Sequence, residues 1–183
     1  MIETKRGVSS KTLRIWSAGC ASGEEPYSIA IILDSVLGPD SGEWTVRILG
    51  SDIDDASLRT ARTGAYQNPD VLEGIEREKY FVHEGEESNR QYRVVDGVRR
   101  KVKFEKINLL KDHGRRYFDM VLCRNVLIYF GKGLQDRVHA LLHDSLARLG
   151  VLGLGQRESA RFSSHEAAYQ EIDPLQRLYR RLA

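Results

Sequence analysis

The chain has few of the residues that cross-link small proteins or hold metal ions. It contains only two cysteines, Cys20 and Cys123, among 183 residues. They are far apart and lie in no spacing typical of metal ligands. Because each follows a predicted buried strand, we interpret both as reduced thiols of a cytoplasmic protein, and we predict neither a disulfide nor a metal site.

The sequence also lacks a charge excess and a long apolar run. Its 28 Lys and Arg residues nearly balance 26 Asp and Glu residues, and the resulting net charge of +2 gives little support to a nucleic-acid binder. No apolar stretch approaches the roughly 20 residues of a membrane span, and residues 1–11 do not form a secretory signal. We therefore expect no membrane insertion. The 41% of hydrophobic residues can bury the core of one soluble domain.

Apolar strand-like runs alternate with segments of helical periodicity. The small residues after the first strand lead into a helix that Gly38-Pro39 ends, and Gly64 ends the next helix. This order predicts an α/β sandwich of three layers around a mostly parallel sheet. The expected elements are strands at 13–16, 44–53, 118–123 and 151–154 and helices from about 24, 54–61 and about 134–149.

One stretch, residues 80–104, interrupts this alternation. Tyr92–Val95 and Arg100–Phe104 flank Asp96-Gly97, and Asp-Gly between alternating segments is a strong hairpin signal. We therefore expect a small antiparallel β insertion on the main sheet.

The loop Ser17–Gly23 follows a strand and opens a helix, so backbone N–H groups there face a ligand. This signal is weak by itself, because many strand-to-helix turns are rich in small residues. Only Gly19 and Gly23 of a G-x-G-x-x-G pattern are present, and no G-K-[ST] follows, which disfavours a dinucleotide or a nucleotide phosphate.

Carboxylates stand at the same expected edge. Asp52 or Asp54 could accept ribose hydroxyls or cap the next helix; we assign Asp52 to the ribose and Asp54 to the cap. Glu24 is favoured by the helix dipole, and the pair Glu24-Glu25 could also meet a cationic ligand group. S-adenosylmethionine (SAM) carries an ammonium and a sulfonium, whereas a dinucleotide carries phosphates that a carboxylate repels, so the charges favour SAM.

Four runs of residues resemble the chemotaxis-receptor protein-glutamate methyltransferases, in the order of that family and over about residues 12–183. The combination of GEEPYS with CRNVLIYF is highly specific. The runs are Arg14–Ser28, Ser51–Asp54, Ile107–Leu110 and Phe118–Phe130.

The resemblance implies a SAM-dependent methyltransferase (Rossmann-like) fold with a seven-stranded sheet whose last strand is antiparallel. It further implies that SAM methylates glutamate carboxylates of a chemotaxis receptor, leaving S-adenosylhomocysteine. By this analogy Gly19 and Glu24 hold the methionine end, Asp52 holds the ribose, and Asn108 and Leu109 border the adenine. Arg124 and Asn125 line the pocket near the methyl group, and Tyr129 lies beside the acceptor, so that Tyr129 and Arg124 are the candidate catalytic residues.

Simpler roles exist for several of these residues. Tyr129 could be a packed aromatic, Asn108 a turn residue, and Arg124 the partner of a surface carboxylate. The chain also departs from the family: we expect the family's helical N-terminal domain to be absent, acidic residues 83–88 replace an Arg-Gly-rich turn, and Gly155–Glu158 replaces a His-Ser-Glu sequence. A catalytically incomplete SAM-binding or partner-binding module, or a methyltransferase with another acceptor, therefore remains an alternative.

Overall fold

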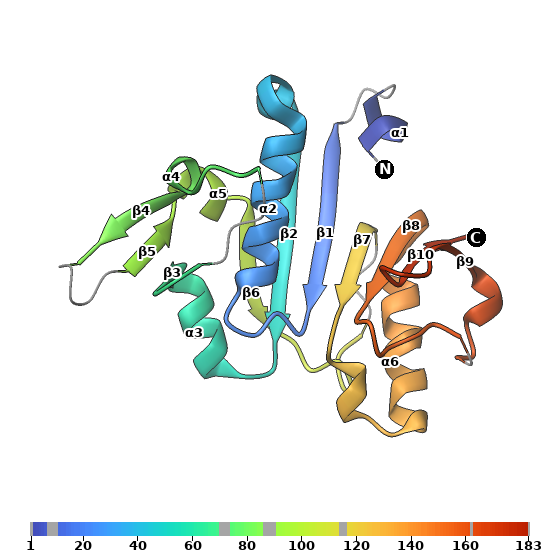
Figure 1. The fold of residues 1–183 in the computed structure, drawn as a ribbon. Coiled ribbons are helices and arrows are strands. Elements are labelled where there is room, and N and C mark those ends of the chain that lie inside the picture. Colours follow the sequence, from blue (N-terminus) through green and yellow to red (C-terminus); the bar gives the residue numbers. More distant parts are fainter. Residues whose placement is uncertain are drawn as a thin grey trace.

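The computed structural model describes residues 2–6, 11–69, 74–85, 91–113, 117–161 and 163–182. Its centre is a seven-stranded sheet of order β6-β2-β1-β7-β8-β10-β9 (Figure 1). Neighbouring strands from β6 to β8 are parallel, and β10 is antiparallel to both β8 and β9. The predicted sheet and its antiparallel last strand are confirmed. The strands are β1 (Thr12–Ala18), β2 (Thr45–Asp52), β6 (Val102–Lys106), β7 (Phe118–Cys123), β8 (Leu146–Leu154), β9 (Tyr169–Asp173) and β10 (Leu178–Arg181).

Most helices come after a strand, and the end of that strand sets where the first turn of the helix lies. Helix α2 begins at Glu24, as predicted, and gives way at Gly38 to a 3-10 helix. Helix α3 ends at Gly64, whose φ of 62° is a left-handed conformation that glycine adopts readily. The helices are α1 (Ile2–Arg6), α2 (Glu24–Leu37), α3 (Asp55–Thr63), α4 (Arg77–Tyr80), α5 (Asp96–Arg99) and α6 (Lys132–Ser145), with 3-10 helices η1 (Gly38–Glu43), η3 (Leu127–Tyr129) and η4 (Glu166–Ala168).

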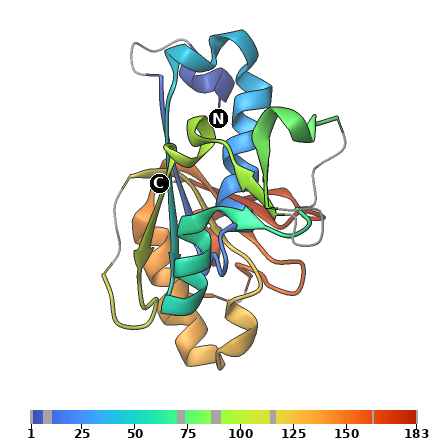
Figure 2. The ribbon, with the colours of Figure 1, turned by 90° about the vertical axis from the view of Figure 1, so that its left-hand side faces the viewer.

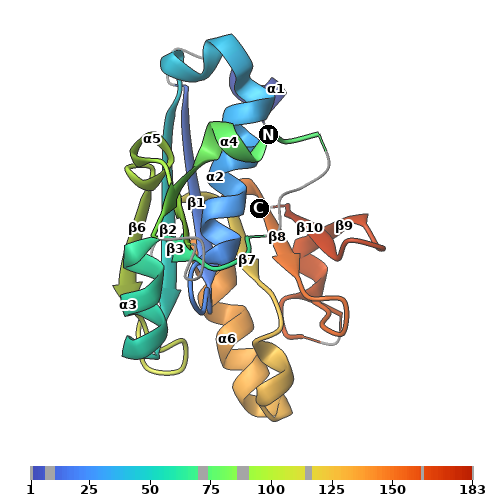
Figure 3. The same ribbon diagram turned by 60° about the vertical axis from the view of Figure 1, so that its left-hand side comes forward.

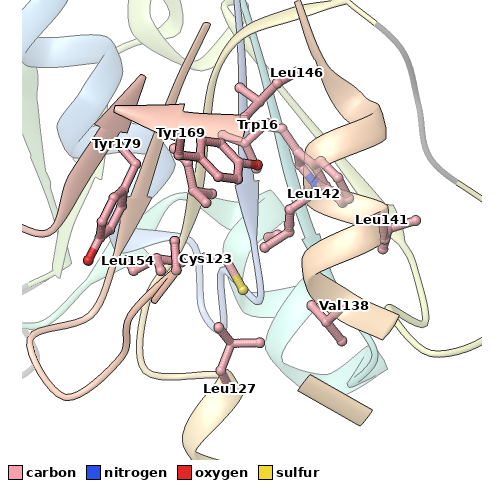
Figure 4. Packing of buried hydrophobic residues seen from close by; sticks show 14 of the residues in the cluster. Trp16, Cys123, Leu127, Val138, Leu141, Leu142, Leu146, Leu154, Tyr169 and Tyr179 are labelled. Atoms are coloured by element: carbon pink, nitrogen blue, oxygen red, sulfur yellow. The ribbon is translucent and has the colours of Figure 1, made fainter. Parts of the chain in front are cut away.

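Helices lie on both faces of the sheet (Figure 2), and alternation along β1 divides the core between these faces. Leu13 and Ile15 point into the cluster that α2 covers. Trp16 belongs to the other cluster, where Val138 and Leu142 of α6 pack against β7, β8 and β10 (Figure 4). Helices on both faces make the predicted three layers.

The antiparallel insertion differs from its predicted boundaries. Strand β5 (Gln91–Val94) pairs with β4 (Phe81–Glu84) and β3 (Ala65–Tyr66), beside α2 (Figure 3). The hairpin expected around Asp96-Gly97 is wrong, because these residues begin the short helix α5 and β6 joins the main sheet beside β2. Asp96 suits a first helical turn and pairs with Arg99 at 3.2 Å.

The boundary between the last long helix and its strand is also shifted. Helix α6 ends at Ser145 rather than Leu149, and β8 begins directly at Leu146. The apolar spacing of Leu146, Leu149 and Leu152 continues a helical period into the strand, so periodicity does not separate the two. Leu149 has a φ of 62° and is 55% exposed.

Among the described residues, no helix combines the length and the apolar character that a membrane crossing requires.

Candidate functional site at the carboxyl edge of the sheet

The loops that follow β1, β2, β6 and β7 meet at one edge of the sheet, toward which the arrowheads point in Figure 1. They enclose a cavity of about 430 Å³, which we call the edge pocket. That volume lies within the range of small-molecule sites. The pocket is lined by Gly19, Ala21, Asp52, Ile53, Ile107, Asn108, Leu109, Leu110, Asn125, Val126, Tyr129 and Phe130.

Most of the predicted site residues share this pocket although they come from four separate loops. Gly19, Asp52, Asn108, Leu109, Asn125 and Tyr129 all line it, whereas Glu24 and Arg124 do not. The agreement follows from parallel strands, since their carboxyl ends bring sequence-distant loops to one edge.

Gly19 lies where the first loop approaches the loop after β7. Its φ is 76°, and a Cβ atom added there would lie 2.4 Å from Cγ2 of Val126. Glycine is therefore required both by the backbone conformation and by the close contact.

The two carboxylates after β2 have separate roles. Asp54 accepts backbone N–H groups of Ala56 and Ser57, which confirms it as the cap of α3. The Ser57 hydroxyl, and after it these backbone N–H groups, hold the pKa of Asp54 below its usual value. Asp52 lines the pocket and accepts the N–H groups of Ala21 at 2.8 Å and Asp54 at 3.0 Å. These bonds fix its carboxylate between two loops, and its contact with a ribose stays a prediction.

Asn108 combines a turn role with a place in the pocket. Its Oδ1 accepts the backbone N–H of Leu110 at 3.0 Å, and its own N–H donates to Asp112 at 2.7 Å. The turn sets the direction of Leu109 and Leu110, whose side chains pack partly against the core. The polar side chain of Asn108 suits the hydrogen-bonding edge of a purine, and the apolar side chain of Leu109 suits its flat face.

The two neighbouring glutamates point to different places. Glu24 accepts the hydroxyl of Ser22 at 2.8 Å and lines a second cavity between α2 and the insertion. Glu25 accepts the hydroxyl of Ser17 at 2.7 Å and pairs with Arg124 at 3.4 Å. Successive helical residues are about 100° apart. The structure therefore brings Glu25, which the sequence offered together with Glu24 but which was not assigned to the methionine end, to the ends of β1 and β7.

Tyr129 is not a packed aromatic, because 80% of its surface is exposed at the rim of the pocket. Arg124 is half-exposed, with its guanidinium toward Glu25. Tyr129 is therefore open to a further molecule on the open side of the pocket. Arg124 does not line the pocket, and its pair with Glu25 agrees with the simpler role of partner to a carboxylate.

Both cysteines lie near the site but are chemically quiet. Burial, with Asp52 adding to it, raises the pKa of the Cys20 thiol to about 12. Burial also raises the pKa of Cys123, beside Glu158 and Glu25. Neither thiol forms a thiolate near neutral pH, so neither is a candidate nucleophile.

The sequence analysis assigned no role to Glu158, whose buried carboxylate follows β8 and contacts the loop after β7. The one sequence feature that drew attention to this residue was that Gly155–Glu158 differs from the His-Ser-Glu sequence of the family.

Across the described residues, no cluster of His, Cys, Asp and Glu suited to a metal ion is found.

The fold is that of the SAM-dependent methyltransferases. A glycopeptide N-methyltransferase, MtfA, superposes with a TM-score of 0.50 at 11% identity, covering 83% of this chain and 49% of its own. The DszA carbon methyltransferase has the same TM-score at 15% identity, with 82% and 30% of the two chains covered. At such low identity the likeness concerns the fold alone.

The chain belongs to the CheR methyltransferase family, and the model of its SAM-binding domain matches residues 1–174. A chemotaxis protein methyltransferase of Listeria innocua is 36% identical over 86% of this chain and 56% of its own length. The putative methyltransferase Cher3 of Pseudomonas putida is 35% identical over 93% of this chain and 63% of its own length. The chain thus spans a little over half of these curated relatives.

Proposed function

We propose that this chain transfers the methyl group of SAM to glutamate side chains of a chemotaxis receptor, forming methyl esters. The observation that carries the proposal is the edge pocket, which gathers Gly19, Asp52, Asn108 and Asn125 in a chain of the CheR family. The relatives named as chemotaxis protein methyltransferases support the receptor as the acceptor. The two free cysteines agree with a cytoplasmic location.

The pocket residues fit SAM by chemistry. Asp52 can accept ribose hydroxyl hydrogens through lone pairs that its two backbone bonds leave unused. Asn108 and Leu109 would border the adenine. Glu25 offers a negative charge to the ammonium of the methionine end, a role that the sequence had given to Glu24.

Methyl transfer to a carboxylate needs alignment more than proton transfer. The acceptor is already ionised at neutral pH, so it attacks the sulfonium methyl without a general base, and the neutral thioether leaves. The residues then orient the acceptor at about 3–3.5 Å from the methyl carbon and replace its water shell. We assign this orienting role to Tyr129, at the open rim of the pocket, and to Arg124, which directly precedes the pocket residue Asn125 in the loop after β7.

The exposed rim favours one second candidate, a SAM-binding signalling module with an incomplete active site. Tyr129 is 80% exposed, so the described residues alone leave the reacting region open to water. Both candidates require SAM binding, and only the first requires turnover.

The deciding experiment incubates the protein with methyl-labelled SAM and receptor cytoplasmic fragments and counts base-labile methyl groups. Wild type is expected to label the fragments, and fragments whose acceptor glutamates are replaced by alanine should stay unlabelled. Binding of SAM without any labelling, in a version as long as the curated relatives, would instead select the signalling module. A base-stable label would point to another acceptor.

A further inference from the structure

The carboxylate of Glu158 is the convergence point of a loop thirty residues away in sequence. The side chain is only 5% exposed. Its two oxygens together accept five backbone N–H groups. Oε1 accepts from Val126 at 2.8 Å, Leu127 at 2.7 Å and Ile128 at 3.4 Å, and Oε2 accepts from Gly155 at 2.7 Å and Asn125 at 3.0 Å.

Burying a charged carboxylate in this way lowers stability unless the carboxylate is fully hydrogen-bonded, so its hydrogen-bond partners indicate what the residue does. Here the donors are successive N–H groups of residues 125–128, which would otherwise need other partners at the start of η3. Each partner therefore satisfies the other, and the end of β8 is tied to the loop after β7.

The tied loop is the one that forms a wall of the edge pocket. Asn125, Val126, Tyr129 and Phe130 all line the pocket. Asn125 has a φ of 59°, in the left-handed region that asparagine adopts more readily than most other non-glycine residues. The Glu158 carboxylate holds this turn, because it binds the N–H of Asn125 and of the three residues that follow.

Gly155 leaves the space that this contact needs. A Cβ atom added at Gly155 would lie 2.7 Å from Asn125 Oδ1, 2.7 Å from Glu158 Oε2 and 2.8 Å from the Asn125 nitrogen. An alanine there would push the carboxylate and the loop apart without removing either.

We propose that Glu158 is a positioning residue that fixes the loop of residues 125–130 as a wall of the edge pocket. The consequence for ligand affinity rests on the proposed function, whereas the order of the loop does not. Glu158 itself touches neither the cofactor nor the acceptor in this role; it acts through Asn125 and Tyr129.

Two measurements test the role on Glu158→Gln and Gly155→Ala. In the protein without ligand, amide hydrogen exchange at residues 125–130 should accelerate by about tenfold or more, because local opening becomes easier. Calorimetry should show S-adenosylhomocysteine binding about tenfold more weakly, which corresponds to 1.4 kcal/mol. For Glu158→Ala, added formate should restore part of the affinity by occupying the vacated carboxylate position.

Asp34→Asn is the matched control, since Asp34 is a partly buried carboxylate that holds Lys101 and Tyr80 on the other side of the domain. It should lower overall stability yet leave affinity and loop exchange unchanged. Wild-type exchange in both Glu158→Gln and Gly155→Ala would overturn the inference, as would an equal affinity loss in the control. If wild type binds no ligand, the proposed function fails, and the exchange measurement still decides the role of Glu158.

Discussion

Asp52 is the residue whose contact with ligand can be separated from its contacts with the protein. Asp52→Ala should weaken S-adenosylhomocysteine binding by about 1.5–3 kcal/mol, the range for hydrogen bonds to a charged group. Part of this loss will come from the freed N–H groups of Ala21 and Asp54. A ligand that lacks the ribose hydroxyls cannot bond to Asp52 through them. The affinity of this ligand should therefore fall less on Asp52→Ala than the affinity of S-adenosylhomocysteine does.

The control for Asp52 is Asp55→Ala, three residues along, whose exposed carboxylate pairs with Lys106 instead. Its affinity should equal that of wild type. Equal losses for the complete and the hydroxyl-free ligand would show that Asp52 acts on the loops only.

Glu24 and Glu25 form a matched pair within one helical turn. We predict that Glu25→Gln weakens SAM binding, by about tenfold, because the ammonium loses a charged acceptor worth at least about 1.4 kcal/mol. Glu24→Gln should change affinity little, since its carboxylate faces the second cavity. Calorimetric titrations of both variants with SAM check this, and the reverse order of effects would return the role to Glu24.

At the scale of elements, α6 carries a histidine that couples stability to pH. His139 is 3% exposed, and burial lowers its pKa from the ordinary 6.5. The unfolded chain therefore takes up a proton at a pH where the folded chain stays neutral, so stability falls as the pH drops below 6.5. Each unit of depression contributes about 1.4 kcal/mol to the fall.

The variant His139→Gln should lose less stability than wild type between about pH 7.5 and about pH 5, across the ordinary histidine pKa. Urea unfolding at both pH values measures the difference. The exposed His113 serves as the control, and His113→Gln should keep the wild-type slope. Parallel slopes for wild type and His139→Gln would contradict the assignment.

The antiparallel insertion is the element on which peptide docking can be tested. Residues 83–88 carry three glutamates and no arginine, and residues 86–88 of this stretch lie outside the described part. In the described part, Glu84 already engages Arg93 at 2.6 Å. A receptor C-terminal pentapeptide with acidic residues would meet like charge, so we expect no tight binding. A low-micromolar dissociation constant in a fluorescence titration would contradict this.

For the whole molecule, we predict that these 183 residues alone methylate slowly. The exposed Tyr129 leaves the acceptor position open to water, and the chain spans 56% of the length of the Listeria innocua relative. A version extended to the length of the curated relatives should turn over faster while SAM affinity changes much less. Turnover of the shorter version at about 1 s⁻¹ or above would show that no cover is needed.

The sequence by itself determined the class of fold and the edge at which the candidate site lies. Strands such as Phe118–Cys123 are short apolar runs, and strand-to-helix loops such as Ser17–Gly23 follow them, so both signals are local. Parallel strands then bring Gly19, Asp52, Asn108 and Asn125 to one edge whatever the details of packing.

Tertiary structure decided what depends on partners distant in sequence. Strand β6 pairs with β2 rather than folding back on β5, because its partly buried Val102 and Phe104 pack against the core there, with Phe104 against Tyr27 at 5.5 Å between ring centres. Which of Glu24 and Glu25 faces the ends of β1 and β7 depends on how α2 is oriented about its own axis, because neighbouring helical residues point about 100° apart. Glu158 gains its role only when β8 places it beneath residues 125–128, since no pattern in the sequence states which backbone N–H groups a carboxylate will meet.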